Sequence, residues 1–141
     1  MSALYIETSA LLAWLFGEEN AREVMDRING AERIVTSVLT RLETERSLLR
    51  AEKTGLITAA DRQKLLGLFR KVSSGWYFFS ISEEVLARSC AEFPVEPVRS
   101  LDAIHLATAL ESIQLFQDVN VLSFDKRVAG NLMALGLQAA V

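Results

Sequence analysis

The sequence holds one cysteine, Cys90, and one histidine, His105, among its 141 residues. A single cysteine can form neither an internal disulfide nor a cysteine-based zinc cage, which fits a reducing compartment. Long hydrophobic runs are also lacking: the longest uncharged N-terminal segment, residues 8–17, is too short to span a bilayer. No basic residue precedes that segment as a secretory signal requires. We therefore expect a cytoplasmic protein without thiol redox chemistry or a membrane anchor.

Proline is also scarce, because only Pro94 and Pro97 are present and both fall in one connection. The chain shows no internal repeat and no low-complexity segment. Half of its residues are hydrophobic, which at this length is enough for a sizeable core. We expect a single domain over residues 1–141.

The net charge is small, −3, and gives no sign of nucleic-acid binding by the molecule as a whole. Its distribution is uneven. Residues 41–71 carry eight basic and four acidic side chains, a balance of +4, which leaves −7 for the rest of the chain. Charge alone fits two interpretations, an ordinary pair of solvated helices or a basic surface on an acidic body.

Short apolar segments alternate with segments of helical periodicity along the whole chain. The alternation predicts an α/β fold with a central, mostly parallel sheet covered by helices on both faces. Ser82 and Ser100 are candidate helix N-caps, and Gly136 is a candidate helix stop. Strands are expected at residues 4–7, 33–37, 76–81, 119–124 and, short and terminal, 137–141. Helices are expected at residues 9–16, 19–28, 38–52, 58–72, 82–91, 100–111 and 126–135, with 38–52 and 58–72 paired as a hairpin.

Two acids stand where a predicted strand gives way to a helix. Glu7 follows the first strand and precedes Thr8 and Ser9, while Asp125 follows residues 119–124 and precedes the last helix. In an open parallel sheet, ligands bind at this carboxyl edge. Taken singly, each acid also has an ordinary explanation, because an acid commonly caps a helix or ends a strand.

Two further acids lie in apolar surroundings. Glu43 follows the core-type residues Leu39 and Leu42, so it falls at the border of a buried helical stripe. Asp102 falls in the first turn of a helix that has very few polar residues to expose. Interaction with the helix dipole explains an acid there and is worth about 0.3–1 kcal/mol. The dipole interaction does not explain why a helix with so few polar residues, and therefore expected to be buried along most of its length, should carry an acid.

The sole histidine suggests one competing site. His105 lies three residues after Asp102 on the same helix face, so a hydrolase triad with Ser9 can be drawn. The sequence has no Gly-x-Ser-x-Gly nucleophile-elbow motif to support such a triad, and it has no phosphate-binding glycine loop. A buried, hydrogen-bonded role therefore fits His105 better.

Four phrases carry a resemblance to a known family. In this order and at these separations, "YIETSALLAWL", "TSVLTRLETERSLLR", "RSLDAIHLATAL" and "LSFDKRVAGNLMALGL" resemble the PIN-domain ribonucleases, in particular the VapC-type toxins of bacterial toxin–antitoxin pairs. The resemblance covers essentially the whole chain and implies a three-layer PIN-like fold. It also implies that four acids meet at the carboxyl edge of the sheet and hold Mg²⁺ or Mn²⁺ for RNA cleavage. By motif position these acids are Glu7, Glu43, Asp102 and Asp125.

The chemistry explains why such acids would need a cation. Two carboxylates about 4 Å apart repel by roughly 4 kcal/mol at an effective dielectric near 20. Oxygen-only ligands favour a hard ion, which can activate a water molecule for hydrolysis of a phosphodiester. Thr8 or Ser9 would then hydrogen-bond a metal ligand or water. Arg99, Lys126 and Arg127 would hold phosphate, although they are equally well explained as surface charges.

The resemblance further implies an RNA substrate, a cognate antitoxin whose tail lies in a groove by the active site, and a homodimer. One departure matters, because Glu7 stands where the family ordinarily has aspartate. The extra methylene moves the carboxylate by ~1.5 Å, which is large beside metal–oxygen bonds of about 2.0–2.1 Å. Two interpretations stay open: a metal-dependent endoribonuclease toxin, attenuated by or adjusted to Glu7, and a weak or inactive PIN module that acts by binding RNA or an antitoxin.

Overall fold

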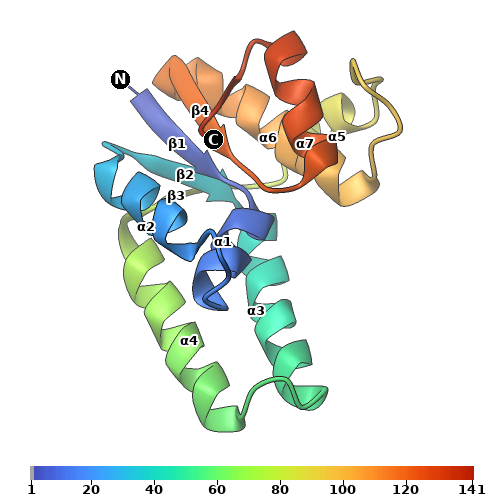
Figure 1. The fold of residues 1–141 in the computed structure, drawn as a ribbon. Helices are drawn as coiled ribbons and strands as arrows, with labels where there is room; N and C mark the ends of the chain where they lie inside the picture. Colours follow the sequence, from blue (N-terminus) through green and yellow to red (C-terminus); the bar gives the residue numbers. More distant parts are fainter. Residues whose placement is uncertain (1) are drawn as a thin grey trace.

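The computed structural model describes residues 2–141, and within them five strands form one parallel sheet (Figure 1). The strand order is β3-β2-β1-β4-β5. The strands are β1 (Ser2–Ile6), β2 (Ile34–Ser37), β3 (Tyr77–Phe79), β4 (Asp118–Leu122) and β5 (Gln138–Ala139). The predicted parallel sheet, including its short terminal strand, is confirmed.

Seven α-helices connect these strands within the described residues. They are α1 (Thr8–Leu15), α2 (Ala21–Gly30), α3 (Val38–Lys53), α4 (Ala59–Val72), α5 (Glu83–Ser89), α6 (Ser100–Phe116) and α7 (Lys126–Leu132). A short 3-10 turn, Met133–Leu135, follows α7 and ends at Gly136, whose φ of 78° suits glycine. None of these helices is both long and apolar enough to cross a membrane.

Helices cover both faces of the sheet because successive strand residues point in opposite directions. Tyr5 and Val121 pack with Leu106 of α6 and Val128 of α7 on one face. On the other face, Leu4, Ile6 and Leu122 pack with residues of α1, α2 and the end of α4. Each fully buried side chain of this size contributes about 1.5–3 kcal/mol relative to an exposed one. The predicted three-layer α/β fold is therefore confirmed.

Helices α3 and α4 form the predicted hairpin, which projects beyond the carboxyl edge of the sheet (Figure 1). A capping box, in which Thr58 and Asp61 exchange hydrogen bonds, begins α4. Because the hairpin extends past the sheet, Leu42 is 58% exposed, and its assignment to the core is wrong; Leu39 is buried as expected. The N-cap expected at Ser100 is also wrong, since Ser100 is the first residue of α6 and Arg99 takes the cap position.

The order of the strands defines a crevice. From β1 the chain moves outward through β2 and β3, and then returns to place β4 on the other side of β1. The direction of winding therefore reverses between β1 and β4. In open parallel sheets, ligands bind outside the carboxyl ends of the strands at this switch point. Glu7 follows β1 directly, and Asp125 lies three residues after the end of β4.

Candidate active site

Glu7 is buried at the start of α1, where its side chain folds back onto its own helix. Oε2 accepts a hydrogen bond from the Ser9 backbone N–H at 3.0 Å. Oε1 accepts from the hydroxyls of Ser9 at 2.5 Å and Ser123 at 2.6 Å. Ser123 lies beside Glu7 because Ile6 and Leu122 are paired in the sheet. Sequence reasoning missed Ser123, although its place at the end of β4 could have pointed to it.

Glu43 lies in the second turn of α3 and is partly buried. Its Oε1 accepts hydrogen bonds from Thr8 Oγ1 at 2.7 Å and from His105 Nε2 at 2.7 Å. Burial raises the pKa of Glu43, but these hydrogen bonds outweigh it and hold the pKa below its usual value. His105 is buried and contacts the Tyr5 hydroxyl through Nδ1 at 2.9 Å, which fits the buried, hydrogen-bonded role expected for it.

Arg99 connects the remaining two acids. Its Nε donates to Asp102 Oδ2 at 3.0 Å, and its Nη2 donates to Asp125 Oδ2 at 3.3 Å. Asp102 is buried in the first turn of α6, whereas the Arg99 side chain is largely exposed. The hydrogen bond to Asp102 raises the pKa of Arg99 above its ordinary value. Asp125 also caps α7 by accepting from the backbone N–H groups of Arg127 and Val128.

These contacts link all four acids at one edge of the sheet. Glu7 connects to Asp125 through Ser123, whose Oγ also accepts from the Asp125 backbone N–H at 3.1 Å. Asp125 connects to Asp102 through Arg99, and one turn of α6 separates Asp102 from His105, which binds Glu43. The links run in this order around the site: Glu7, Ser123, Asp125, Arg99, Asp102, His105, Glu43, Thr8.

Four carboxylates and neighbouring hydroxyls are an oxygen-donor set whose chemistry fits Mg²⁺ or Mn²⁺. Within residues 2–141, however, no three His, Cys, Asp or Glu side chains are grouped closely enough to hold a metal ion. The hydrogen bonds show the reason: Glu7 is turned toward two serines, and the Arg99 guanidinium already pairs with both Asp102 and Asp125. Metal binding by all four acids remains a prediction.

Comparison with known proteins identifies the family. The PIN domain matches residues 4–130. The chain belongs to the PIN domain family. Two relatives, both named Ribonuclease VapC35, come from Mycobacterium tuberculosis strains CDC 1551 / Oshkosh and ATCC 25618 / H37Rv; each is 27% identical over 136 residues, which span 95% of this chain and 93% of the relative. A solved structure, a toxin-antitoxin complex from Klebsiella pneumoniae, matches 88% of both chains with a TM-score of 0.59 at 20% identity, which supports the fold.

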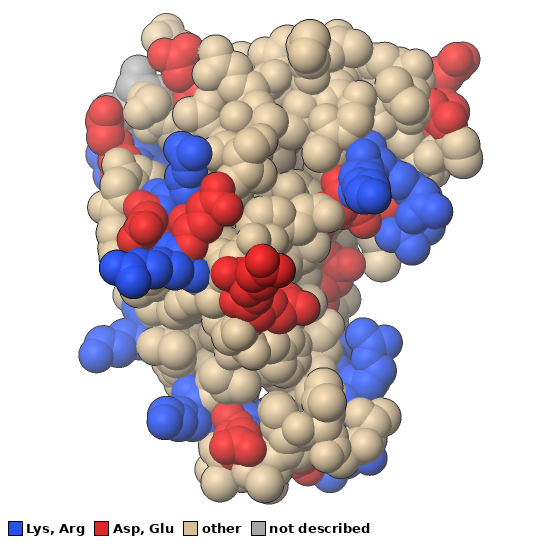
Figure 2. Space-filling view, viewed as in Figure 1, with Lys and Arg blue, Asp and Glu red and all other residues tan. Residues whose placement is uncertain are grey.

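Two groups of basic side chains flank the acids of this PIN domain. Figure 2 shows Lys and Arg on the arm formed by α3 and α4 and, above a recess, near the first turns of α6 and α7. The second group includes Lys126 and Arg127, which are exposed. On the arm, Arg41 and Arg70 pair with Glu45. Four exposed arm residues make no ion pair within the described part of the chain: Arg46, Arg50, Lys64 and Lys71.

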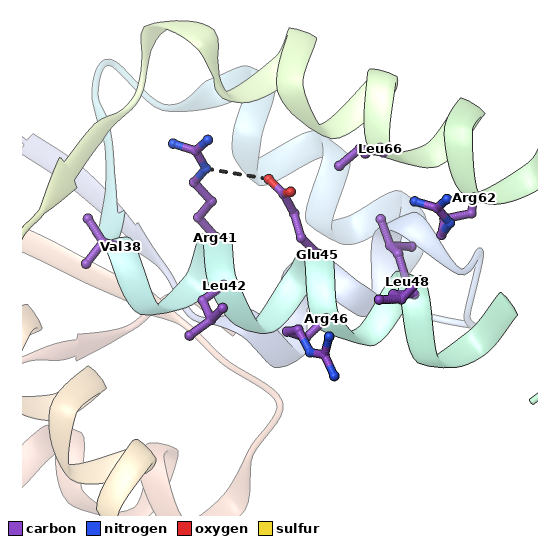
Figure 3. A pocket seen from close by; sticks show the side chains of 9 residues that line it. Val38, Arg41, Leu42, Glu45, Arg46, Leu48, Arg62 and Leu66 are labelled. Carbon is purple, nitrogen blue, oxygen red and sulfur yellow. Dashed lines mark ion pairs between the residues drawn. The ribbon is translucent and has the colours of Figure 1, made fainter. Parts of the chain in front are cut away.

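A groove of about 410 Å³ lies between the two helices of that arm. Leu42, Leu49 and Leu66 are among its apolar lining residues. In Figure 3, Arg41 and Glu45 lie on the side of α3 that faces α4, and a dashed line marks their ion pair. Much of the lining of the groove is therefore apolar, and arginines lie along its length.

Proposed function

We propose that this PIN domain is a metal-dependent endoribonuclease toxin of the VapC type. The observation that carries the proposal is the set of contacts at the switch point of the sheet. Hydrogen bonds join Glu7 to Asp125 through Ser123 and join Asp125 to Asp102 through Arg99, and Glu43 is hydrogen-bonded to His105, one helical turn from Asp102. Carboxylates brought to one edge of a sheet repel one another, so a bound cation would stabilise their approach. The similarity to the VapC35 ribonucleases supports the same proposal.

Asp102, Asp125 and Glu43 would hold the ion, and Glu7 would join them after its side chain turns away from Ser9. A bound Mg²⁺ or Mn²⁺ would supply activation of water and neutralisation of charge on a phosphoryl oxygen. Arg99 has to release Asp102 and Asp125 for the ion to bind, and its freed guanidinium is then placed to pair with an RNA phosphate. Thr8 keeps Glu43 in place throughout, because its hydroxyl donates to Oε1 at 2.7 Å.

Glu7 attenuates the reaction in this proposal. Its longer side chain reaches both Ser9 and Ser123, so the carboxylate is engaged in capping α1 rather than directed at the other acids. The Ser9 hydroxyl therefore donates a hydrogen bond to Glu7, and the Thr8 hydroxyl donates one to Glu43, so the two hydroxyls support different acids. An aspartate in this position would reach the helix N-cap but not Ser123.

RNA is held, in the same proposal, by the basic side chains on both sides of the acids. Phosphate contacts supply most of the sequence-independent affinity for a nucleic acid, and this acidic protein needs local positive charge to make them. Arg46 and Arg50 on the arm have no carboxylate partner among the described residues. On the other side of the acids, Lys126 and Arg127 supply the basic side chains, at the start of α7.

A cognate antitoxin is the proposed protein partner, with a second copy of the chain forming a homodimer. The groove between α3 and α4 supports this proposal, because leucines in its lining and arginines beside them suit an acidic amphipathic segment. The site of action would be the cytoplasm, where RNA and antitoxin are both present.

An RNA cleavage assay tests the proposed activity. The purified protein should cut single-stranded RNA in Mn²⁺ or Mg²⁺ and should lose that activity in EDTA. Asp102→Asn combined with Asp125→Asn should stay folded and remain inactive, which excludes a contaminating nuclease. RNA binding without cleavage under all of these conditions would instead favour the alternative function, a PIN module that acts by binding RNA or the antitoxin; Glu7 is the observation that favours this alternative.

A further inference from the structure

Beside the acids lies a buried histidine that the proposed reaction does not use directly. His105 is 1% exposed, so it cannot touch RNA or bulk water. Both of its ring nitrogens are engaged: Nε2 contacts Glu43 Oε1 at 2.7 Å, and Nδ1 contacts the Tyr5 hydroxyl at 2.9 Å. Each ring nitrogen of His105 therefore has a defined hydrogen-bond partner.

The two partners of His105 determine which of its ring nitrogens donates a hydrogen bond and which accepts one. An ionised carboxylate only accepts, so Nε2 carries the proton and donates to Glu43. With the proton on Nε2, Nδ1 accepts the hydroxyl proton of Tyr5. Burial raises the pKa of Tyr5 well above its ordinary value, and the charge of Glu7 adds to the effect, so the hydroxyl keeps this proton.

Two donors then converge on one oxygen of Glu43. Thr8 Oγ1 and His105 Nε2 both bind Oε1, and within residues 2–141 no hydrogen bond reaches Oε2. The carboxylate is thus fixed in rotation while its second oxygen stays available. The two groups that fix the carboxylate come from α1 and α6, whereas Glu43 itself lies on α3, the first helix of the projecting hairpin.

His105 also connects Glu43 to the helix that carries a second acid, Asp102. Asp102 precedes it by three residues on α6, so the two side chains share one face and lie about 4.5 Å apart along the helix axis. Through His105, the position of α6 determines where Glu43 stands relative to Asp102. Tyr5 ties the same ring to β1, the strand that ends at Glu7.

Resting on the proposed function, we propose that His105 is a positioning residue: its Nε2–H holds Glu43 Oε1 so that Oε2 is presented to the divalent ion shared with Asp102. Tyr5 orients the ring for this purpose. A histidine serving only to fill the core would need its two hydrogen bonds equally, whereas the positioning role depends on the bond from Nε2.

Two amide substitutions separate these bonds. In His105→Gln the amide nitrogen can reach the place of Nε2, whereas in His105→Asn the amide reaches only the place of Nδ1 and can still accept from Tyr5. Both variants lose the ring and should lose similar stability. Val24→Ala, a change in the opposite core layer, provides a control that is destabilised without touching the site.

The measurements are kcat and KM for RNA cleavage in Mn²⁺, together with Mn²⁺ affinity of the RNA-free protein by electron paramagnetic resonance. His105→Asn should lower kcat and weaken Mn²⁺ binding by about 10- to 100-fold, the usual effect of removing a group that orients a metal ligand. KM for RNA should stay unchanged, because His105 is buried. His105→Gln should recover most of both losses, and Val24→Ala should lower only the melting temperature.

The possible outcomes distinguish this inference from the proposed function. If the parent cuts RNA while folded His105→Asn matches it in kcat and Mn²⁺ affinity, or if His105→Gln is as impaired as His105→Asn, the positioning role is overturned alone. If the parent binds Mn²⁺ but cuts no RNA, the proposed function fails, and the loss of Mn²⁺ affinity in His105→Asn still supports the inference. A parent that neither binds Mn²⁺ nor cuts RNA overturns both.

Discussion

Replacing Glu7 by aspartate should increase metal-dependent cleavage. The glutamate makes three hydrogen bonds, to the Ser9 N–H and to the hydroxyls of Ser9 and Ser123. Aspartate withdraws the carboxylate by ~1.5 Å, keeps a preferred N-cap for α1, and cannot span the 2.6 Å contact to Ser123 Oγ. The freed carboxylate is then directed toward the other acids.

The size of the effect follows from these contacts. Losing one hydrogen bond to a charged group costs about 1.5–3 kcal/mol, and relaxation of Ser123 toward another partner offsets part of it. We expect the melting temperature of Glu7→Asp to fall by roughly 3–6 °C. Misplacing a reacting group by about 1 Å can cost on the order of 10²-fold, so kcat should rise about tenfold or more, up to that limit.

The assay is single-stranded RNA cleavage across a Mg²⁺ and a Mn²⁺ titration, with thermal melts of the metal-free proteins beforehand. Glu7→Gln is the matched control, because it keeps the length of glutamate and loses the charge; it should bind the ion more weakly than the parent. If Glu7→Asp is folded and cuts no faster at any metal concentration, the attenuating role of Glu7 is refuted.

Three further predictions follow from the charges and buried groups. Arg99→Gln releases Asp102 and Asp125 from their guanidinium partner, so the RNA-free protein should bind Mn²⁺ more tightly, as measured by calorimetry. Equal or weaker binding would contradict the proposal that Arg99 competes with the ion for these two carboxylates. Arg46→Glu should weaken RNA binding and reduce the slope of log affinity against log salt by about 0.7 or more, whereas Arg22→Glu on α2 should change neither. The raised pKa of Tyr5 means that its stabilisation is present below pH 10 and is lost as the pH rises, because only the unfolded tyrosine ionises readily. Tyr5→Phe should therefore melt lower at pH 8 yet lose less stability than the parent between pH 9 and 11; parallel melting curves would oppose this reasoning.

Most of the fold could be predicted from the sequence because a parallel sheet buries both faces of its strands. The apolar runs that include Tyr5 and Val121 are therefore unmistakable, and the helices between them follow from periodicity. The positions of Glu7 and Asp125 at strand ends could be predicted for the same reason. Strand order could not be derived from periodicity, since pairing of β1 with β4 depends on contacts between residues more than a hundred positions apart.

The side-chain partners at the site were less accessible to sequence reasoning. The sequence allows Arg99 to be a phosphate contact or a surface charge, and its contacts with Asp102 and Asp125 depend on how the loop before α6 approaches α7. The engagement of Glu7 with Ser123 depends on register across the sheet. Leu42 illustrates a different difficulty: its helical spacing fits a core position, but α3 continues past the sheet and leaves that face to solvent.

Anomalous scattering from Mn²⁺ in crystals of the parent protein tests the central claim most directly. The account predicts one strong peak at the carboxyl edge of β1 and β4, with oxygens of Asp102, Asp125 and Glu43 at about 2.0–2.3 Å and with Arg99 displaced from both aspartates. A peak elsewhere on the surface, or no peak at saturating Mn²⁺ with Arg99 still paired to Asp102 and Asp125, would contradict it.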